Sequence, residues 1–592
     1  MQVVGRRWWE TCPVTRLMNS SQANSWERLQ QAIDTEIFSL EESIRALRLR
    51  RNALSPISSL PSEVLTIIFS LLCPPSTDRN PDRHLARLCV SHVCHQWREM
   101  ALNYPFLWSH VDFTDLSLVG ATEILVRAKS APLYLEARVP DRLWDDVRYT
   151  TFRKEVQARI PYVYHLSISA GIFYLHRTLE EFVSSAPTLE SLSLFSSRGY
   201  RNKTTGDHIV VPATLFSGST PRLSSLKIRN CEISWESPLL KGLRHLELLS
   251  LPAKARPELT TWLDALDEMP GLETLALHSL SPIAPFDVKR AATLPSLTHL
   301  EMFSSPGDCA LILAHLDLPA LTALSVTVHT RHANSDKMRV VLPYVARHAH
   351  GPQDSQPLQS VLICSDGDPA DILAWSVPDI NVRVQRPSTF LAETNPPRVA
   401  LSFTSKEWFY PAIQLRLIDA AMSALPLGDL VTLIAQDFTD PPDKQFWLRH
   451  SPQWPLLRHV QLAESFQRGF KEMMLDYNGA REGPLFPSLK ELALAGAVSG
   501  NWESALMKRM EQGVPLELLD LRMCVPRDFV ALELPRENLV NILGPENTAE
   551  PGEQMISAWK TVTRGPFREE VNSLSEFCLY EDLLYEDEDE EE

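Results

Sequence analysis

A short apolar pattern, Leu-x-x-Leu-x-Leu, recurs along the chain and constrains its fold more than any other feature. Six clear copies have their first leucine at Leu189, Leu223, Leu243, Leu272, Leu297 and Leu321. The spacings are 34, 20, 29, 25 and 24 residues, and self-similarity at a period of about 20–50 residues is typical of stacked repeats. Each copy provides a short strand whose side chains alternate between two faces, and one copy alone cannot bury its apolar face. We therefore expect the copies to stack side by side.

Helix-like segments separate these strands, for example at residues 179–183 and 259–266. Weaker copies of the pattern begin at Val163, Leu358, Leu457, Leu489 and Leu516. The pattern resembles the leucine-rich-repeat family, in which Asn or Cys often stands eight residues after the first leucine. Here only Cys231 and Cys524 do so. The resemblance implies an irregular α/β solenoid, or horseshoe, over residues 113–525, with an irregular insertion at about 327–429.

In a leucine-rich-repeat solenoid the side chains between the leucines face the open, concave side. This arrangement gives a set of candidate target-binding residues: Lys227, Arg229, His245, Glu247, His299, Glu301 and Phe303. His245 and His299 occupy the same strand position in their copies, and His459 does so in a later copy. The alternative for each of these residues is a polar side chain that is solvated and binds nothing.

Residues 54–112 carry a different pattern, which predicts a small group of helices. Pro61 suits the first position of a helix because its φ is already favourable, and Glu63 would lie near the positive end of the helix dipole. The apolar residues from Val64 to Leu72 are too many for a one-sided amphipathic helix, so we expect this helix to be covered on more than one side. A block of this size buries a low fraction of its surface. One face should therefore need a partner.

The same residues resemble the F-box through Leu60-Pro-Ser-Glu63, the apolar helix, Val93-Cys-His-Gln-Trp97 and Pro105-Phe-Leu-Trp108. In that family the partner is the Skp1 adaptor of cullin-based ubiquitin ligases, so the resemblance implies a Skp1-like adaptor and a cullin as partners. The residues that match the family's Skp1-binding positions are Leu60, Pro61, Val64, Leu65, Ile68 and Phe69. Those that match its core positions are Val93, Cys94, Trp97, Leu107 and Trp108. With the degenerate repeats that follow, the chain also looks like a class of fungal F-box proteins.

Residues 25–53 predict a helix with a heptad stripe. Its apolar residues are separated by alternating steps of four and three: Ile33, Ile37, Leu40, Ile44 and Leu47. This spacing is typical of a coiled-coil seam, and a seam of three or four heptads is marginal in an isolated helix. Two alternatives follow, self-association through this helix as a coiled coil and packing of the helix back on the F-box-like block.

Composition and charge limit the classes of partner. The net charge is −17, and nine of the acidic residues lie in the last twelve positions. Residues 576–592 are therefore predicted to be an acidic, disordered tail. Residues 1–24 are predicted to be disordered, and residues 526–575 to form a C-terminal cap or an irregular segment. Nine scattered cysteines imply no disulfide framework. No apolar run reaches the length of a signal peptide or a membrane span, so we expect no membrane partner and a cytoplasmic and/or nuclear location.

Motifs for catalysis are absent from the sequence, including the phosphate-binding glycine loop, His-Glu-x-x-His, Gly-x-Ser-x-Gly and the dinucleotide fingerprint. Cys89, His92, Cys94 and His95 fall within seven residues and lack the second ligand pair of a zinc site. Basic residues cluster only at 45–51, which argues against a nucleic-acid partner. We predict a non-catalytic adaptor without cofactor or metal, whose solenoid holds an unknown target protein. The alternative is a scaffold that joins proteins without ubiquitin transfer.

Overall fold

The computed structural model describes residues 26–524 and 548–549, apart from gaps at 73–81, 115, 140–145, 198–208, 252–255, 285–287, 331–334, 352–354, 366–368, 379–395, 406–410, 439–441, 477–483 and 497–501. The predicted N-terminal segment 1–24, nearly all of the predicted cap at 526–575 and the acidic tail 576–592 lie outside the described residues. The chain divides into two compact units, Met1–Ala137 with Thr150–His165, and Arg138–Tyr149 with Leu166–Glu592. Each unit is described by itself.

The first unit begins with helices. In chain order these are α2 (Trp26–Ala53), the 3-10 turn η2 (Pro56–Ser59), α3 (Ser62–Leu72), α4 (Asp82–His92), α5 (His95–Leu102) and the 3-10 turn η3 (Pro105–Trp108). Then follow β1 (His110–Asp112), α6 (Leu118–Ala128), β2 (Leu133–Val139), α7 (Asp146–Arg159), η4 (Ile160–Tyr162) and β3 (Val163–Gly171). Strands β1 and β2 pair in parallel. The side chain of Ser117 caps α6 by accepting a hydrogen bond from the backbone N–H of Gly120 at 3.1 Å, which satisfies one of the free donors of that helix end.

The second unit alternates strands and helices. Its first half comprises α8 (Ile172–Glu181), β4 (Ser191–Ser197), β5 (Ile209–Val211), η5 (Leu215–Gly218), β6 (Ser225–Arg229), β7 (Cys231–Ile233), η6 (Pro238–Leu240), β8 (His245–Leu249), α9 (Leu259–Asp267), β9 (Thr274–His278), β10 (Ala292–Thr293), β11 (His299–Ser304), α10 (Pro306–Ala314), β12 (Leu316–Asp317) and β13 (Ala323–Thr330). Its second half comprises α11 (Ser335–Met338), η7 (Arg339–Val341), α12 (Leu342–Ala349), β14 (Ser360–Ser365), β15 (Ala370–Trp375), β16 (Val399–Ser405), α13 (Pro411–Ala424), β17 (Thr432–Phe438), α14 (Lys444–His450), η9 (Ser451–Gln453), β18 (His459–Leu462), α15 (Glu464–Asp476), β19 (Glu491–Gly496), α16 (Glu503–Glu511), β20 (Leu518–Cys524) and β21 (Thr548–Ala549).

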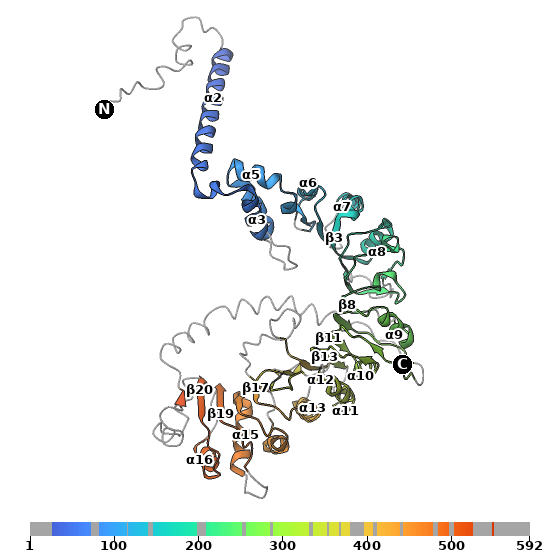
Figure 1. The fold of residues 1–592 in the computed structure, drawn as a ribbon, viewed down its shortest axis with the longest axis vertical. Helices are drawn as coiled ribbons and strands as arrows, with labels where there is room; N and C mark the ends of the chain where they lie inside the picture. Colours follow the sequence, from blue (N-terminus) through green and yellow to red (C-terminus); the bar gives the residue numbers. More distant parts are fainter. Residues whose placement is uncertain are drawn as a thin grey trace, which may run out of the picture. The chain divides into compact units, whose positions relative to one another are not determined.

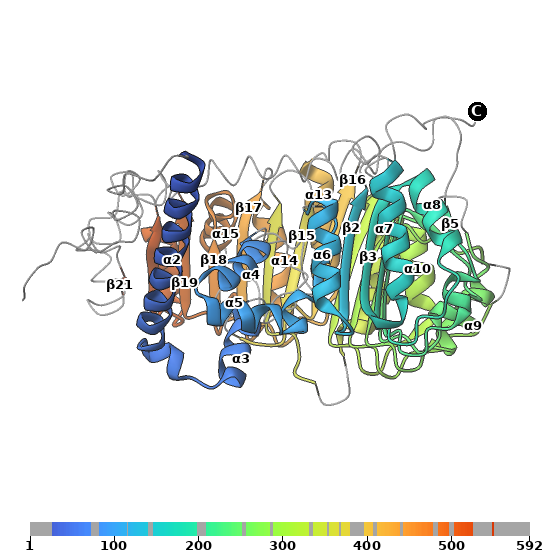
Figure 2. The same cartoon turned by 90° about the horizontal axis from the view of Figure 1, so that it is seen from above.

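Most strands of this unit form one large, mostly parallel sheet, whereas β5 pairs with β7 and β10 with β12 in two separate two-stranded sheets. Strands β4, β6, β8, β9, β11 and β13 pair in parallel, each with the next, and β17 to β21 do the same. Between the two sets the order is β13, β16, β15, β14 and β17, with β15 antiparallel to both of its neighbours. Figure 2 shows these strands side by side. The fold is thus mixed α/β, with helices at the N-terminal end and a large, mostly parallel sheet.

The region 327–429, which we expected to be an irregular insertion, contributes three strands to this sheet. Its departure from the repeat is the single reversed strand β15, which lies between β14 and β16. All six residues of β15 are buried. Its sequence, Ala370-Asp-Ile-Leu-Ala-Trp375, includes the buried Asp371 and does not alternate between apolar and polar residues, so the Leu-x-x-Leu-x-Leu pattern does not mark it.

Helices cover one face of the sheet. Helix α10 contacts β11 and β13, α13 contacts β15, and α15 contacts β17, β18 and β19, as the layers in Figure 1 show. The second and third apolar positions of the pattern point into this layer in two of the copies: Leu246 and Leu248 are 0% exposed, and Leu300 and Met302 are 1% exposed. Successive strand residues point to opposite faces, so the residues between these leucines lie on the other face.

Candidate functional site

Helix α3 has two apolar faces with different surroundings. Leu65 and Phe69, four residues apart, are 0% exposed, and α3 contacts α4, α5 and η3. On another face Val64 is 39% exposed, Ile67 58% and Leu71 72%. These three residues are spaced by three and four positions, so they form one stripe along the helix surface. We call Val64, Ile67 and Leu71 the α3 stripe.

Of the six predicted Skp1-binding residues, the structure places Leu60 and Pro61 just before α3 and the other four on both faces of that helix. Leu65 and Phe69 lie inside the core of the helical block, which removes them from any partner surface. Pro61 and Val64 are exposed, whereas Leu60 and Ile68 are half-buried. Ile67 and Leu71 were missed by the sequence analysis, although their spacing from Val64 was the signal that could have found them.

Most of the predicted core residues hold the helical block together. The ring of Phe69 lies 5.0 Å from the ring of Trp97, and Leu107 and Trp108 are 3% and 1% exposed. The indole N–H of Trp108 donates a hydrogen bond to the carbonyl of Ala101 at 2.7 Å, so the polar atom of this buried ring is satisfied.

Two residues at the junction of α4 and α5 differ in role from the packing positions that we expected. Cys94 is the N-cap of α5, and its sulfur accepts from the backbone N–H of Trp97 at 3.5 Å. Val93 is 58% exposed, which corrects its prediction as a core residue. It lies in the bend between the two helices, where a side chain is not directed by the helix packing.

The comparison with protein families matches this helical block. Residues 57–114 match the family model described as F-box-like. Residues 57–114 therefore form an F-box-like domain. None of the curated proteins compared with the chain matches it. The match covers a small part of the chain, and the sheet of the second unit lies outside it.

The second candidate surface is the sheet face opposite the helices, between β4 and β13. Its half-exposed residues line up in the strand register: His245 and His299 in one row, Lys227, Glu247 and Glu301 in the next, and Phe195, Arg229, His278 and Phe303 in a third. We call this set, with His329 of β13, the polar sheet face. All seven predicted target-binding residues belong to it.

Charged side chains on the polar sheet face pair across neighbouring strands. The ammonium of Lys227 lies 2.5 Å from the carboxylate of Glu247, and His278 Nε2 lies 3.0 Å from Glu301 Oε1. The guanidinium of Arg229 stands over the ring of Phe195 at 5.0 Å. These groups are partly exposed, so each pair has modest strength and remains accessible to a competing partner.

Aromatic rings continue this surface across β9, β11 and β13. The ring of Phe303 lies 5.7 Å from the ring of His278 and 5.7 Å from that of His329. His329 Nδ1 is 2.9 Å from the hydroxyl of Thr404. Phe195, His278 and His329 were missed by the sequence analysis. Their signal was the strand register, because Phe195 and His278 stand in the same row as Phe303.

The two histidines of the first row differ in their hydrogen-bond partners. His245 Nδ1 lies 2.9 Å from the hydroxyl of Thr274, and His299 Nδ1 lies 2.8 Å from that of Thr298. Burial lowers the pKa of His299 below its ordinary value, because the charged imidazolium loses hydration there. The polar sheet face thus offers cations, carboxylates and aromatic rings together, a mixture suited to binding a protein surface.

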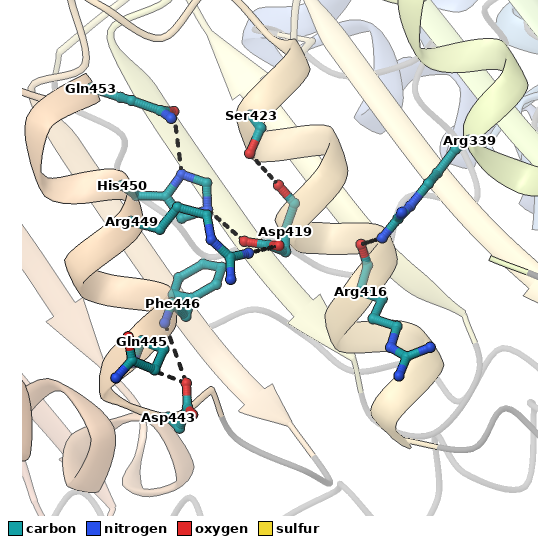
Figure 3. Close-up of polar contacts among 10 residues, drawn as sticks. All are labelled: Arg339, Arg416, Asp419, Ser423, Asp443, Gln445, Phe446, Arg449, His450 and Gln453. Carbon is teal, nitrogen blue, oxygen red and sulfur yellow. Dashed lines mark hydrogen bonds and ion pairs between the residues drawn. The ribbon is translucent and has the colours of Figure 1, made fainter. Parts of the chain in front are cut away.

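A buried histidine–aspartate pair joins α13 and α14 (Figure 3). His450 is 0% exposed, with Nε2 3.0 Å from Asp419 Oδ1 and Nδ1 3.3 Å from Gln453 Oε1. Its ring stacks on Trp454 at 4.7 Å. Both ring nitrogens are occupied and a ring face is covered, so no atom of His450 is left to accept a proton from a substrate.

The surroundings of Asp419 support a structural role for this pair. Burial alone would raise the pKa of Asp419, but the hydrogen bond from His450 and the charges of Arg449, His450 and Arg339 lower it below its ordinary value. Arg449 also forms an ion pair with Asp419. The carboxylate therefore ties α14 to α13, as Figure 3 shows.

Within the described part of the chain, no three His, Cys, Asp or Glu side chains converge in a way that could hold a metal ion. No helix among the described residues combines the length and the apolar character that crossing a bilayer requires.

Proposed function

We propose that this chain is a substrate-recognition adaptor of a Skp1–cullin–F-box ubiquitin ligase. The observation that carries the proposal is the F-box-like domain with an apolar stripe on its surface. An apolar stripe on a helix loses its contact with water only when a partner covers it. In the F-box family that partner is a Skp1-like adaptor, and the α3 stripe is the surface that we assign to it.

The target protein is assigned to the polar sheet face. Its residues come from six neighbouring strands, and strands that are hydrogen-bonded to each other hold side chains in fixed relative positions. The proposal includes an irregular leucine-rich-repeat solenoid as the architecture of this unit, supported by the parallel strands and the recurring leucines. The chain would supply binding, and the ubiquitin transfer would be carried out by its partners.

Affinity purification of the full chain from proteasome-inhibited cells tests this function. We expect a Skp1-like protein and a cullin in the purified complex, with captured targets that accumulate under inhibition. Purification of the Skp1-like protein without a cullin would favour the alternative, a scaffold that joins proteins without ubiquitin transfer. Purification of neither would contradict the adaptor role.

A charge reversal on the polar sheet face tests where the target binds. Glu247→Lys with Glu301→Lys should reduce target capture while the Skp1-like protein is retained. The control is Glu236→Lys with Glu258→Lys, which changes the net charge equally at exposed positions of the same unit. Equal target capture by both double variants would show that the target binds elsewhere.

A further inference from the structure

Helix α2 exposes the heptad stripe that the sequence predicted. Ile33 is 37% exposed, Ile37 49%, Ile44 47% and Leu47 65%, while Leu40 is half-buried. In the described residues, the stripe therefore does not pack back on the F-box-like domain. Leu54, the next heptad position after Arg51, lies one residue beyond the end of α2 and is 86% exposed. An exposed apolar seam of this kind, interrupted by Arg51, is a surface that a partner helix can cover.

The residue types along the seam indicate how many helices it joins. With Ile37 and Ile44 at the first seam position of the heptad, the second seam position is occupied by Ile33, Leu40, Leu47 and Leu54. The positions that flank these two are charged at Asp34, Glu36, Glu41, Arg48 and Arg50, so the apolar stripe is narrow and occupies one face of the helix. The seam thus fits one partner helix.

The charges along α2 indicate what that partner is. The half of the helix before the middle of the seam is acidic, with Asp34, Glu36, Glu41 and Glu42. The half after it is basic, with Arg45, Arg48, Arg50 and Arg51. All eight belong to α2. A helix that is acidic in one half and basic in the other is complementary to a reversed copy of itself. In a parallel pair the arginine-rich ends would lie against each other.

We propose that α2 forms an antiparallel, two-stranded coiled coil with α2 of a second copy of this chain. The register that aligns residue 42 of one copy with residue 42 of the other places Ile37 opposite Leu47 and Ile44 opposite Leu40. In antiparallel coiled coils the heptad position that follows the second seam position (e) faces the same position of the other helix, and so does the one that precedes the first (g). Asp34 therefore faces Arg48, and Glu36 faces Arg50. Symmetry repeats each of these contacts.

The competing arrangements are less favourable in this sequence. The antiparallel register yields four attractive pairs and one repulsive contact, between the two Glu41 side chains, and it places each Arg51 opposite Ile33 of the other copy. A parallel register pairs Glu36 with Glu41 of the other copy twice and places Arg51 against Arg51 in the seam. Like charges in such positions destabilise a coiled coil.

The dimer has a consequence for the rest of the chain. An overlap from residue 30 to residue 54 spans about 37 Å at about 1.5 Å per residue. Because the F-box-like domain begins at residue 57, the two copies of that domain would emerge from opposite ends of the coiled coil. Each copy would then keep its own α3 stripe accessible. This inference does not depend on the proposed function.

Sedimentation equilibrium of the full chain tests the dimer. The wild-type chain, of 66.9 kDa as a monomer, should show a concentration-dependent doubling of mass. Ile37→Asp with Ile44→Asp should abolish that doubling, because carboxylates would be buried in the seam. The matched control is Phe38→Asp with Leu49→Asp, which changes two exposed apolar residues of α2 outside the seam and should leave the dimer intact. A monomeric wild type, or equal effects of the two double variants, would overturn the proposal.

A charge-swap experiment tests the antiparallel direction. Arg48→Glu with Arg50→Glu, and separately Asp34→Arg with Glu36→Arg, should each remove the homodimer by turning four attractive pairs into repulsive ones. An equimolar mixture of the two variants should restore a dimer, since every pair becomes attractive again between unlike copies. Failure of the mixture to associate, or a stronger homodimer of the Asp34→Arg, Glu36→Arg variant, would contradict the antiparallel direction.

Discussion

Truncation of a buried leucine in the large sheet is the substitution whose cost in stability follows most directly from the structure. Leu246 in β8 is 0% exposed and lies in register between Leu226 and Leu275, each 1% exposed. Leu→Ala changes in cores cost about 2–5 kcal/mol, and the cost grows with the cavity that remains. The backbones on both sides of Leu246 are held by the parallel ladder and cannot collapse into the space. We therefore expect Leu246→Ala to cost about 3–4 kcal/mol.

The assay must resolve one part of a large chain, because a two-unit protein need not unfold in one step. Hydrogen exchange of the β6, β8 and β9 amides measures local opening. A loss of about 3 kcal/mol corresponds to a fall in protection of about 100-fold. The control is Glu247→Gln, which removes the partly exposed contact with Lys227 and should cost less than about 1 kcal/mol. Equal loss of protection in the two variants would refute the assigned alternation of the strand faces.

Three further predictions test other parts of the fold. Gly→Ala changes in helices usually increase protein stability, but Gly469→Ala should destabilise the second unit, because the added methyl group would overlap the backbone carbonyl of Pro442. Thermal melting should show a lower melting temperature for this variant. The control Gly307→Ala, whose methyl group meets open space in α10, should raise the melting temperature or leave it unchanged. Trp108→Phe should lower the stability of the F-box-like domain by about 1 kcal/mol, since the carbonyl of Ala101 loses the indole N–H and keeps only backbone donors such as the N–H of Tyr104, and an unchanged melting temperature would contradict this packing. The Asp419→Asn variant should be less stable than the wild type at neutral pH. Folding lowers the pKa of Asp419, so the stabilisation of the fold by this carboxylate is present above the ordinary pKa of 3.8 and is lost as the pH falls through the folded-state pKa. The stability difference between wild type and variant should accordingly narrow below about pH 4, and a difference that widens on acidification would refute the assigned charge of this carboxylate.

The repeat pattern was sufficient to predict parts of the second unit. Leu-x-x-Leu-x-Leu places buried residues on one strand face, and the structure has this alternation in β8 and β11. The reversed strand β15 could not be predicted, because a strand buried on both faces, here with the buried Asp371 among its apolar residues, carries no sign of its direction. The row that joins Phe195, His278 and Phe303 also depends on register between strands, which no single strand reveals.

The candidate partner surface of α3 was only partly predictable for a related reason. A helix that is apolar on more than one side has no unique inward face in its sequence. The position of α5 and η3 decides that Leu65 and Phe69 turn inward, since Phe69 meets Trp97 there. Aspartate at position 65 would consequently unfold the domain and would not report on Skp1 binding.

Calorimetric titration of the full chain with a Skp1-like adaptor measures directly whether the α3 stripe is the surface that binds this partner. Ile67→Asp with Leu71→Asp introduces carboxylates on the α3 stripe at positions that are 58% and 72% exposed, so the domain should stay folded. We predict that binding weakens by at least about 100-fold, since an ionised group would be desolvated at the contact. The matched control, Val119→Asp with Val126→Asp, alters exposed residues of α6 at 78% and 62% exposure and should bind as wild type does. Unchanged affinity of the α3 variant, or an equal loss in the α6 control, would contradict the assigned interface.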